Sequence, residues 1–338
     1  MSADSEFDLI ARYFDRPVPP GMLGVGDDCA LLPLSPGCEL AVSTDMLVQG
    51  QHFLADVDPR SLGHKALAVN LSDLAAMGAR PLACTLALSL PGIDHPWLQG
   101  FSDGFHALAE KSRCPLVGGD TTHNPDGIVI SVTVMGEVRR AHALRRSGAR
   151  EGDDIWLSGS LGAAYVALLL RQGYLPADAA RLQASCKAMD WPVPRLHLGR
   201  YLGGVAHAAI DLSDGLLQDL GHILEQSHCG AELRLDALPA DPSLDGLEEA
   251  VRREAILGGG DVYELCFTAP PLRREQIHAL QQRLGVPLTR VGTIVRGAGV
   301  RVLDARGDEI PITLRGFDHF ARTTSPSPTP TPTGGPLP

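Results

Sequence analysis

Apolar and polar residues follow two periods along the chain, one typical of strands and one typical of helices. Strands are predicted at residues 39–44, 82–90, 128–138, 153–158, 262–268 and 289–295. Helices are predicted at residues 62–77, 95–112, 161–172 and 273–284, and after Ser213 with a buried stripe of Leu216, Leu217, Leu220, Ile223 and Leu224. Helices and strands therefore alternate throughout.

Local signals predict where several of these elements begin and end. Ser160 and Ser213 stand where an N-cap is expected for the helices that follow them, and Gly173 would end the first of these helices. The short apolar run Leu116-Val117 is expected to enter a glycine turn.

A break in the pattern near residue 140 predicts two domains, at residues 1–140 and 141–322, joined by a basic linker at 139–150. The last segment, 323–338, is rich in Pro, Ser, Thr and Gly and has no apolar periodicity. We expect it to be a disordered tail.

Composition narrows the functional class. The 338 residues are 44% hydrophobic and carry a formal net charge of −11. The negative charge argues against a nucleic-acid partner. If the substrate is anionic, we expect divalent cations to bridge it to the acidic protein. The N-terminus lacks the layout of a signal peptide, and no apolar run is long enough to cross a membrane. Seven scattered cysteines without a CxxC pair suit reduced thiols in the cytoplasm.

Aspartates recur in short motifs beside glycines or at strand ends. These motifs are Gly26-Asp27-Asp28, Ser43-Thr44-Asp45, Asn70-Leu71-Ser72-Asp73, Gly118-Gly119-Asp120, Asp211-Leu212-Ser213-Asp214 and Gly258-Gly259-Gly260-Asp261. Asp and Gly both favour turns, so a surface turn is the better reading of the first motif taken alone.

Two of the aspartates are harder to explain as turn residues. Asp45 is expected just after an apolar strand, and Asp73 lies four residues after Val69 on a mostly apolar helix side. A buried carboxylate is costly unless it is paired or binds a metal. Pairing of Asp73 with Lys65 or Arg80 and binding of a cation are both open at this point.

The residue types point to a hard cation. Carboxylates without a His/Cys cluster suit magnesium or calcium better than zinc. The chain has no P-loop, and Gly24-Val25-Gly26 lacks the third glycine of a dinucleotide fingerprint. Backbone amides at the helix start near Asp211 to Gly215 could attract phosphate, although capping by Ser213 and Asp214 would also explain those two residues.

Taken in order, the motifs resemble the thiamine-monophosphate kinase family from Glu6 to Phe320. The matching strings are residues 7–14, 24–30, 43–45 with His52-Phe53, 65–79, 118–122, 210–216, 263–267 and 316–320.

The resemblance implies a two-domain α/β fold with mixed sheets, shared with the aminoimidazole ribonucleotide synthetase superfamily. It also implies a homodimer whose N-terminal domains pair through their sheets, and a cleft between the domains for ATP and several Mg²⁺ ions. The implied reaction transfers the terminal phosphoryl of ATP directly to thiamine monophosphate, giving ADP and thiamine diphosphate.

Site residues follow from the resemblance position by position. The implied metal ligands are Asp28, Ser43, Thr44, Asp45, Asp73, Asp120, Asp211 and Asp214. Among them Asp45, Asp73, Asp120 and Asp214 would carry the catalysis. The implied ATP contacts are Gly119, Asp120, Arg146 and Ser213, and the implied substrate contacts are His52, Asp261 and Phe317.

The chain also departs from the family pattern. Asp261-Val262 stands where the family has Glu-Asp, which shortens the acidic substrate contact by one methylene, and Ser102 replaces a frequent Tyr expected near ATP. Sister enzymes that share ATP and magnesium, a two-metal phosphohydrolase and a non-catalytic nucleotide-binding regulator are the rival hypotheses. His52-Phe53 and the 316–320 string favour the thiamine branch over its sister enzymes.

Overall fold

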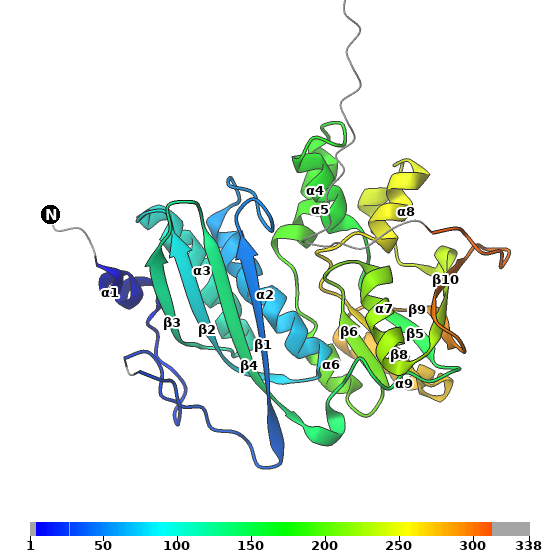
Figure 1. Ribbon diagram of the computed structural model, residues 1–338, viewed down its shortest axis with the longest axis horizontal. Coiled ribbons are helices and arrows are strands. Elements are labelled where there is room, and N and C mark those ends of the chain that lie inside the picture. The colour runs from blue at the N-terminus through cyan, green and yellow to red at the C-terminus, as the bar shows by residue number, and fades with distance from the viewer. Residues whose placement is uncertain (1–4, 27, 313–338) are drawn as a thin grey trace, which may run out of the picture.

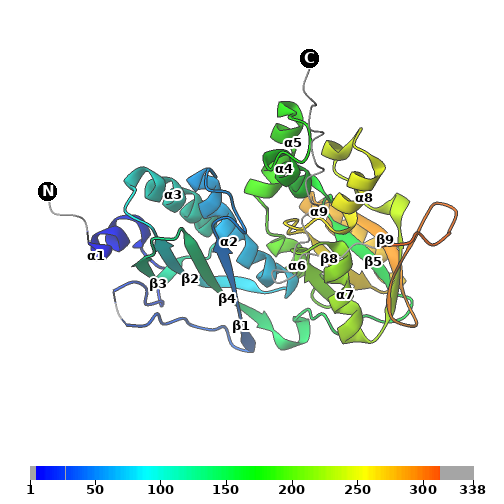
Figure 2. The same ribbon diagram turned by 45° about the horizontal axis from the view of Figure 1, so that its top comes forward.

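The computed structural model describes residues 5–26 and 28–312, which form two halves, each built on one sheet (Figures 1 and 2). The first sheet has the strand order β1-β4-β2-β3 and the second has the order β10-β7-β9-β5-β8-β6. Both sheets contain parallel and antiparallel pairs, so the predicted α/β fold with mixed sheets is confirmed.

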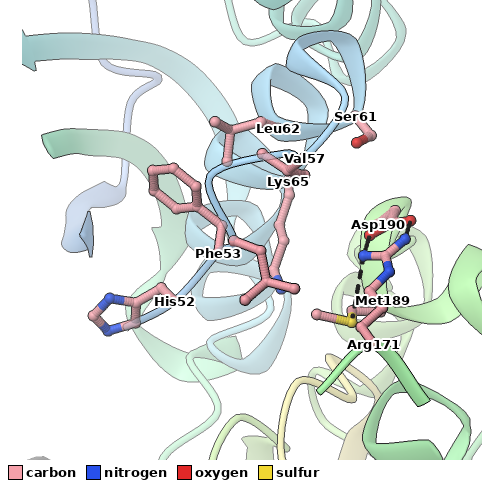
Figure 3. A pocket seen from close by; sticks show the side chains of 10 residues that line it. His52, Phe53, Val57, Ser61, Leu62, Lys65, Arg171, Met189 and Asp190 are labelled. Carbon is pink, nitrogen blue, oxygen red and sulfur yellow. Dashed lines mark hydrogen bonds and ion pairs between the residues drawn. The ribbon is translucent and has the colours of Figure 1, made fainter. Parts of the chain in front are cut away.

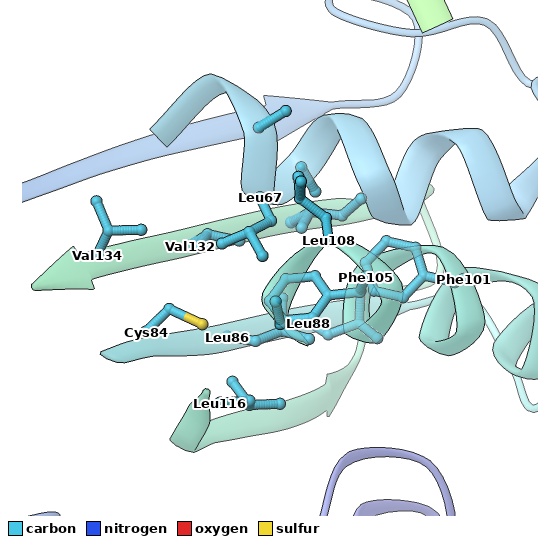
Figure 4. Packing of buried hydrophobic residues seen from close by; sticks show 14 of the residues in the cluster. Leu67, Cys84, Leu86, Leu88, Phe101, Phe105, Leu108, Leu116, Val132 and Val134 are labelled. Carbon is cyan, nitrogen blue, oxygen red and sulfur yellow. The ribbon is translucent and has the colours of Figure 1, made fainter. Parts of the chain in front are cut away.

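The helices that cover the N-terminal sheet lie, among the described residues, on one of its two faces. Its strands are β1 (Cys38–Val48), β2 (Arg80–Leu90), β3 (Leu116–His123) and β4 (Val129–Arg139). The covering helices are α2 (Pro59–Ala76) and α3 (His95–Ser112), and α1 (Glu6–Leu9) with a π-helical turn (Ile10–Phe14) lies beside α3. Figure 4 shows Leu67 of α2 and Phe105 of α3 directed at the strand side chains.

Helices α2 and α3 begin where the sequence supplies caps. Asp58 accepts hydrogen bonds from the amides of Arg60 and Ser61, and Asp94 accepts one from the amide of Trp97, so amides of each first turn are satisfied. A proline in the first turn of each helix adds to this signal.

The C-terminal half carries a six-stranded sheet with helices around it. Its strands are β5 (Asp154–Ser158), β6 (Ala208–Asp211), β7 (Gly230–Arg234), β8 (Leu265–Ala269), β9 (Leu288–Val295) and β10 (Gly299–Leu303). Its α-helices are α4 (Ala163–Arg171), α5 (Ala179–Asp190), α6 (Leu196–Leu202), α7 (Leu216–Ser227), α8 (Glu249–Leu257) and α9 (Arg274–Leu284). Short 3₁₀ turns occupy Arg140–His142, Leu235–Ala237, Pro242–Leu244 and Pro271–Arg273.

Three local predictions about where elements begin or end are wrong. The run after Leu116 does not turn but continues as β3 through the glycines, because Gly119 pairs so closely with β2 that a Cβ would lie 1.9 Å from the Leu86 oxygen. Neither predicted serine cap is used: the N-caps of α4 and α7 are Gly162 and Gly215.

Helix α2 joins the two halves. It packs on α3 and the first sheet on one side and contacts α6, α5 and β6 of the other half. A Cβ on Gly199 of α6 would lie only 1.9 Å from the Ala75 oxygen, so the two helices approach each other at backbone distance. The single carboxylate within α2, that of Asp73, is therefore placed at the junction of the halves.

Candidate active site

Strand β1 and helix α2 supply the N-terminal part of the site. Asp45 lies within β1, not after it as expected, because the strand runs on to Val48. Ser43 and Asp45 point to the α2 side of the sheet, where the Ser43 hydroxyl donates to Asp73 (2.6 Å) and the amide of Asp45 donates to Asn70 Oδ1 (2.8 Å). Thr44 faces the other side and donates to the Val132 carbonyl oxygen (3.1 Å).

The end of β6 and the start of α7 supply the C-terminal part. Asp211 is the last residue of β6 and is buried, while Asp214 is half-buried in the following loop. The amides of Ser213, Asp214 and Gly215 donate to the buried Asp219 carboxylate at 3.0–3.1 Å. These amides are thus engaged within the chain, which contradicts the interpretation that they attract phosphate directly.

The four aspartates of the two parts act on one another electrostatically. Burial raises the pKa of Asp45 to about 7, and the charges of Asp73 and Asp214 add to this effect. Burial, followed by the charge of Asp73, raises the pKa of Asp211 to about 8. We call Asp45, Asp73, Asp211 and Asp214 the carboxylate cluster; it draws two members from each half.

Within residues 5–26 and 28–312, Asp73 forms no ion pair with a basic side chain. Lys65 Nζ instead lies 2.8 Å from Asp261 Oδ2, and Arg80 Nη2 lies 2.6 Å from Glu137 Oε1. Burial raises the pKa of Asp73, while the hydrogen bond from Ser43 and the nearby charge of Arg146 oppose that rise. The pairing of Asp73 with Lys65 or Arg80, left open by the sequence, is therefore not realised.

Two of the predicted ATP contacts, Arg146 and Ser213, lie near the cluster on different elements. Arg146 is exposed on the linker, close enough for its charge to act on Asp73, and its carbonyl oxygen accepts a hydrogen bond from Ser227 (3.0 Å). Ser213 is exposed on the loop beside Asp214. Ser102, by contrast, is fully buried and donates to the Tyr13 carbonyl oxygen (2.6 Å), so it serves the packing of the N-terminus.

Besides Thr44, whose side chain faces the other side of the sheet, three predicted residues lie apart from the cluster within one chain. Gly119 and Asp120 are exposed on β3, and β3 is separated from β1 by two intervening strands. Neighbouring strands are about 4.8 Å apart, so the three steps from β3 to β1 place Asp120 roughly 14 Å from the strand that carries Asp45. Asp28 is exposed on the loop before β1, which Figure 1 shows on the side of the sheet away from the C-terminal half.

The predicted substrate contacts lie near the first turns of α2. His52 Nδ1 accepts a hydrogen bond from the amide of Val48 (3.0 Å), and His52, Phe53, Lys65 and Met189 are among the residues around a small cavity between α2 and the α4–α5 pair (Figure 3). The cavity holds about 10 Å³, the space of a single water. Phe317 lies outside the described residues.

The carboxylate cluster fits the chemistry of magnesium. Its members are buried or half-buried, their charges repel, and the buried Ser72 side chain interacts with Asp211 in the direction that opposes the rise in the Asp211 pKa. Among residues 5–26 and 28–312, no three His, Cys, Asp or Glu side chains converge tightly enough to cage an ion. Magnesium commonly takes only one or two carboxylates and completes its shell with waters and substrate phosphates, so such an open set suits it.

Sequence reasoning missed four residues that shape the site: Asp219, Asn70, Lys65 and Tyr263. Tyr263 is buried, its hydroxyl donates to Asp261 Oδ1 (2.9 Å), and its pKa is raised by burial and then by the charge of Asp261, with Asp45 and Asp211 adding. Asn70, Lys65 and Tyr263 all stood inside quoted motifs, and an acidic residue one turn into α7 was the only signal for Asp219.

Family comparisons agree with the two-sheet architecture and define the class. Residues 26–138 match the family described as AIR synthase related protein, N-terminal domain, and residues 150–305 match its C-terminal domain. The chain is therefore an AIR synthase related protein with both domains of that class.

Individual relatives narrow the class. The thiamine-monophosphate kinase of Salmonella typhimurium is 45% identical over 327 residues, covering 94% of this chain and 99% of that protein, and the Escherichia coli K12 protein of that name is 46% identical over 328 residues with the same coverage. The chain belongs to the thiamine-monophosphate kinase family.

Solved structures support the same assignment. The crystal structure of thiamine-monophosphate kinase from Stenotrophomonas maltophilia K279a has 48% identity and a TM-score of 0.79, covering 84% of this chain and 91% of that one. A second structure, AaThiL complexed with AMPPCP and TMP, has 28% identity and a TM-score of 0.74, covering 86% and 90%.

Proposed function

We propose that the chain transfers the terminal phosphoryl of ATP to thiamine monophosphate, in one direct step, and so makes thiamine diphosphate. The observation that carries the proposal is the carboxylate cluster, in which Asp45 and Asp73 of one half meet Asp211 and Asp214 of the other. In the part of the chain that the structure describes, Asp73 has no basic ion-pair partner. Family membership supports the same reaction, and a family structure holds AMPPCP and TMP together.

Several Mg²⁺ ions are the proposed metal component. Asp45, Asp73, Asp211 and Asp214 would hold them, with Ser43, Thr44, Asp28 and Asp120 as further predicted ligands. Bound magnesium supplies charge neutralisation between the two polyanionic reactants and fixes their geometry.

The chain's own groups bind and orient the reactants. Gly119, Asp120, Arg146 and Ser213 are the proposed ATP contacts, and Arg146 brings positive charge to the Asp73 side of the cluster. His52, Asp261 and Phe317 are the proposed contacts to thiamine monophosphate. The acceptor phosphate has a second pKa of about 6, so it is largely dianionic at neutral pH and needs no general base.

A labelled-product experiment tests this proposal. With γ-labelled ATP, Mg²⁺ and thiamine monophosphate, the label should appear in thiamine diphosphate with one ADP per product. Without acceptor, the protein should retain no covalent label. Release of the label as free phosphate would identify a phosphohydrolase, and a label on Ser43 or an aspartate would overturn direct transfer.

A homodimer paired through the N-terminal sheets is proposed as the assembly. The outer face of β1 exposes the apolar side chains Leu40, Val42 and Met46, at 48%, 58% and 56%, on every second or fourth residue. An open apolar sheet face of this kind is typical of an interaction surface.

Light scattering on the eluting protein tests the pairing. The 35.9-kDa chain should elute at about twice its mass, and the double variant Val42→Asp, Met46→Asp should elute as a monomer. Leu272→Asp, at an exposed position of the other half, is the matched control and should stay dimeric. A monomeric wild-type protein would contradict the pairing.

No helix within the described ranges is long and apolar enough to cross a membrane. All seven cysteines are free thiols, which supports a reducing compartment, and we propose the cytoplasm. The proposed partners are ATP and thiamine monophosphate, without nucleic acid or membrane.

A further inference from the structure

Lys65 is a buried charge that the proposed function leaves unexplained. It lies in the first half of α2 with 4% of its surface exposed. Only three of the 29 Lys and Arg residues of the chain are lysines. A lysine at this buried position is therefore unusual for a chain whose basic residues are mostly arginines. A compact ammonium forms a single-point contact where a planar guanidinium would need more room.

The partner of Lys65 belongs to the other half of the molecule. Its Nζ lies 2.8 Å from Asp261 Oδ2, and the second oxygen, Asp261 Oδ1, accepts the Tyr263 hydroxyl at 2.9 Å. Both carboxylate oxygens of Asp261 are therefore engaged, one by each half.

The backbone around Asp261 is held as firmly as its side chain. Asp261 has φ +60°, and its amide donates to the Ser213 oxygen (2.8 Å), while the amide of Tyr263 donates to the Leu212 oxygen (2.7 Å). A Cβ on Gly260 would lie 2.6 Å from the Ser213 oxygen, so only glycine permits this approach. The segment of Asp261 is thus seated on the loop that carries the C-terminal members of the carboxylate cluster.

The ion pair consequently fixes one end of the junction between the halves. Lys65 and Asp73 lie on the same side of α2, eight residues or about 12 Å apart along the helix. At the Asp73 end, α2 supplies a cluster member; at the Lys65 end, it holds Asp261 in place.

We propose that Lys65 is a positioning residue for the phosphate acceptor, acting through Asp261. The role rests on the proposed function, because it needs an acceptor that carries a positive ring, as thiamine does. Lys65 and Tyr263 fix the direction from which the Asp261 carboxylate meets that ring. The Lys65 ammonium also compensates the negative charge of Asp261, so the carboxylate keeps an ion-pair partner when no acceptor is bound.

The location ties this role to the acceptor and not to ATP. Lys65 lines the same small cavity as His52, a proposed acceptor contact. Of the proposed nucleotide contacts, Arg146 lies on the linker and Asp120 lies on β3, while Ser213 meets the Asp261 segment through its backbone oxygen.

Steady-state kinetics with each substrate varied in turn tests the proposal. Lys65→Met and Asp261→Asn should each raise the KM for thiamine monophosphate about tenfold or more while the KM for ATP stays within about twofold. The double variant, which leaves no uncompensated buried charge, should be no worse than the poorer single variant. Lys65→Arg should recover part of the affinity, and Lys111→Met, at an exposed lysine of α3, should match wild type.

The contrary outcomes are equally distinct. Equal rises in both KM values, additive effects in the double variant, or an unchanged KM for the acceptor would each overturn the positioning role. If Lys65→Met does not fold, the double variant and Lys65→Arg decide by the same criteria. Absence of thiamine diphosphate with the wild-type protein would overturn the proposed function itself, and this role with it.

Discussion

Asp219 was not among the predicted site residues, yet it holds part of the site in place. Its carboxylate lies inside α7 and accepts the amides of Ser213, Asp214 and Gly215. Burial is the main cause that raises the pKa of Asp219 to about 7, and the charge of Asp214 adds to it. The arrangement holds the backbone of residues 213–215, which carries Asp214.

Truncating Asp219 should therefore loosen this loop. Asp219→Ala leaves three amides without their acceptor, and we expect a loss of about 2–4 kcal/mol in the free energy of unfolding. Urea unfolding measures this loss. The matched control is Glu225→Ala, at an exposed carboxylate of the same helix (81% exposed side chain), which should change stability by less than about 0.5 kcal/mol. Equal stability of the two variants would show that Asp219 does not hold the loop.

Single residues also mark the limit of sequence reasoning. Ser213 could be predicted as a cap because it stands before an apolar-periodic run. The helix instead begins at Leu216 with Gly215 as its N-cap, and the amide of Ser213 donates to Asp219. The choice between a metal site and an ion pair for Asp73 likewise depended on where Lys65 and Arg80 find partners, and both partners are distant in sequence.

Helices and strands could be predicted from the sequence where a capping residue, a proline or glycine and the apolar periodicity all indicated the same element. Helix α3 spans His95–Ser112 as predicted, because the Asp94 cap, an early proline and an amphipathic stripe coincide. Strand β3 was cut short in the prediction because glycines usually mark turns. In this sheet they permit a close strand approach, which is a tertiary effect.

Glycines also set the spacing of α2 and α3. A Cβ on Gly104 would lie 1.8 Å from the Arg60 oxygen, so Gly104→Ala must separate the helices. We expect a loss of about 2 kcal/mol or more in the free energy of unfolding. Gly221→Ala in α7, where a Cβ meets nothing within 4 Å, should instead be neutral or stabilise by up to about 1 kcal/mol. Thermal unfolding of both variants checks the contrast; a stable Gly104→Ala would refute the close packing.

At the scale of the whole molecule, the site exists only because two halves meet. Helical and strand periods could predict the elements but not the packing of α2 against α6, which brings residues 45 and 73 to residues 211 and 214. Only the likeness of the ordered motifs to a known family joined these positions in advance. Even so, Asp28 and Asp120 lie apart from the cluster within one chain, and their roles as metal ligands remain predictions.

The variant Asp73→Asn tests most directly whether the carboxylate cluster between the two halves is a cation-dependent active site. Asparagine keeps the shape and the hydrogen bond with Ser43 but removes a buried charge that raises the pKa of its neighbour Asp211. Formation of thiamine diphosphate and the melting temperature should be measured side by side, with and without Mg²⁺.

We predict that the variant loses at least about a hundredfold in kcat, keeps or raises its melting temperature without Mg²⁺, and loses stabilisation by Mg²⁺. A variant that melts earlier without Mg²⁺ yet turns over like wild type would show that Asp73 is structural, and would contradict the account.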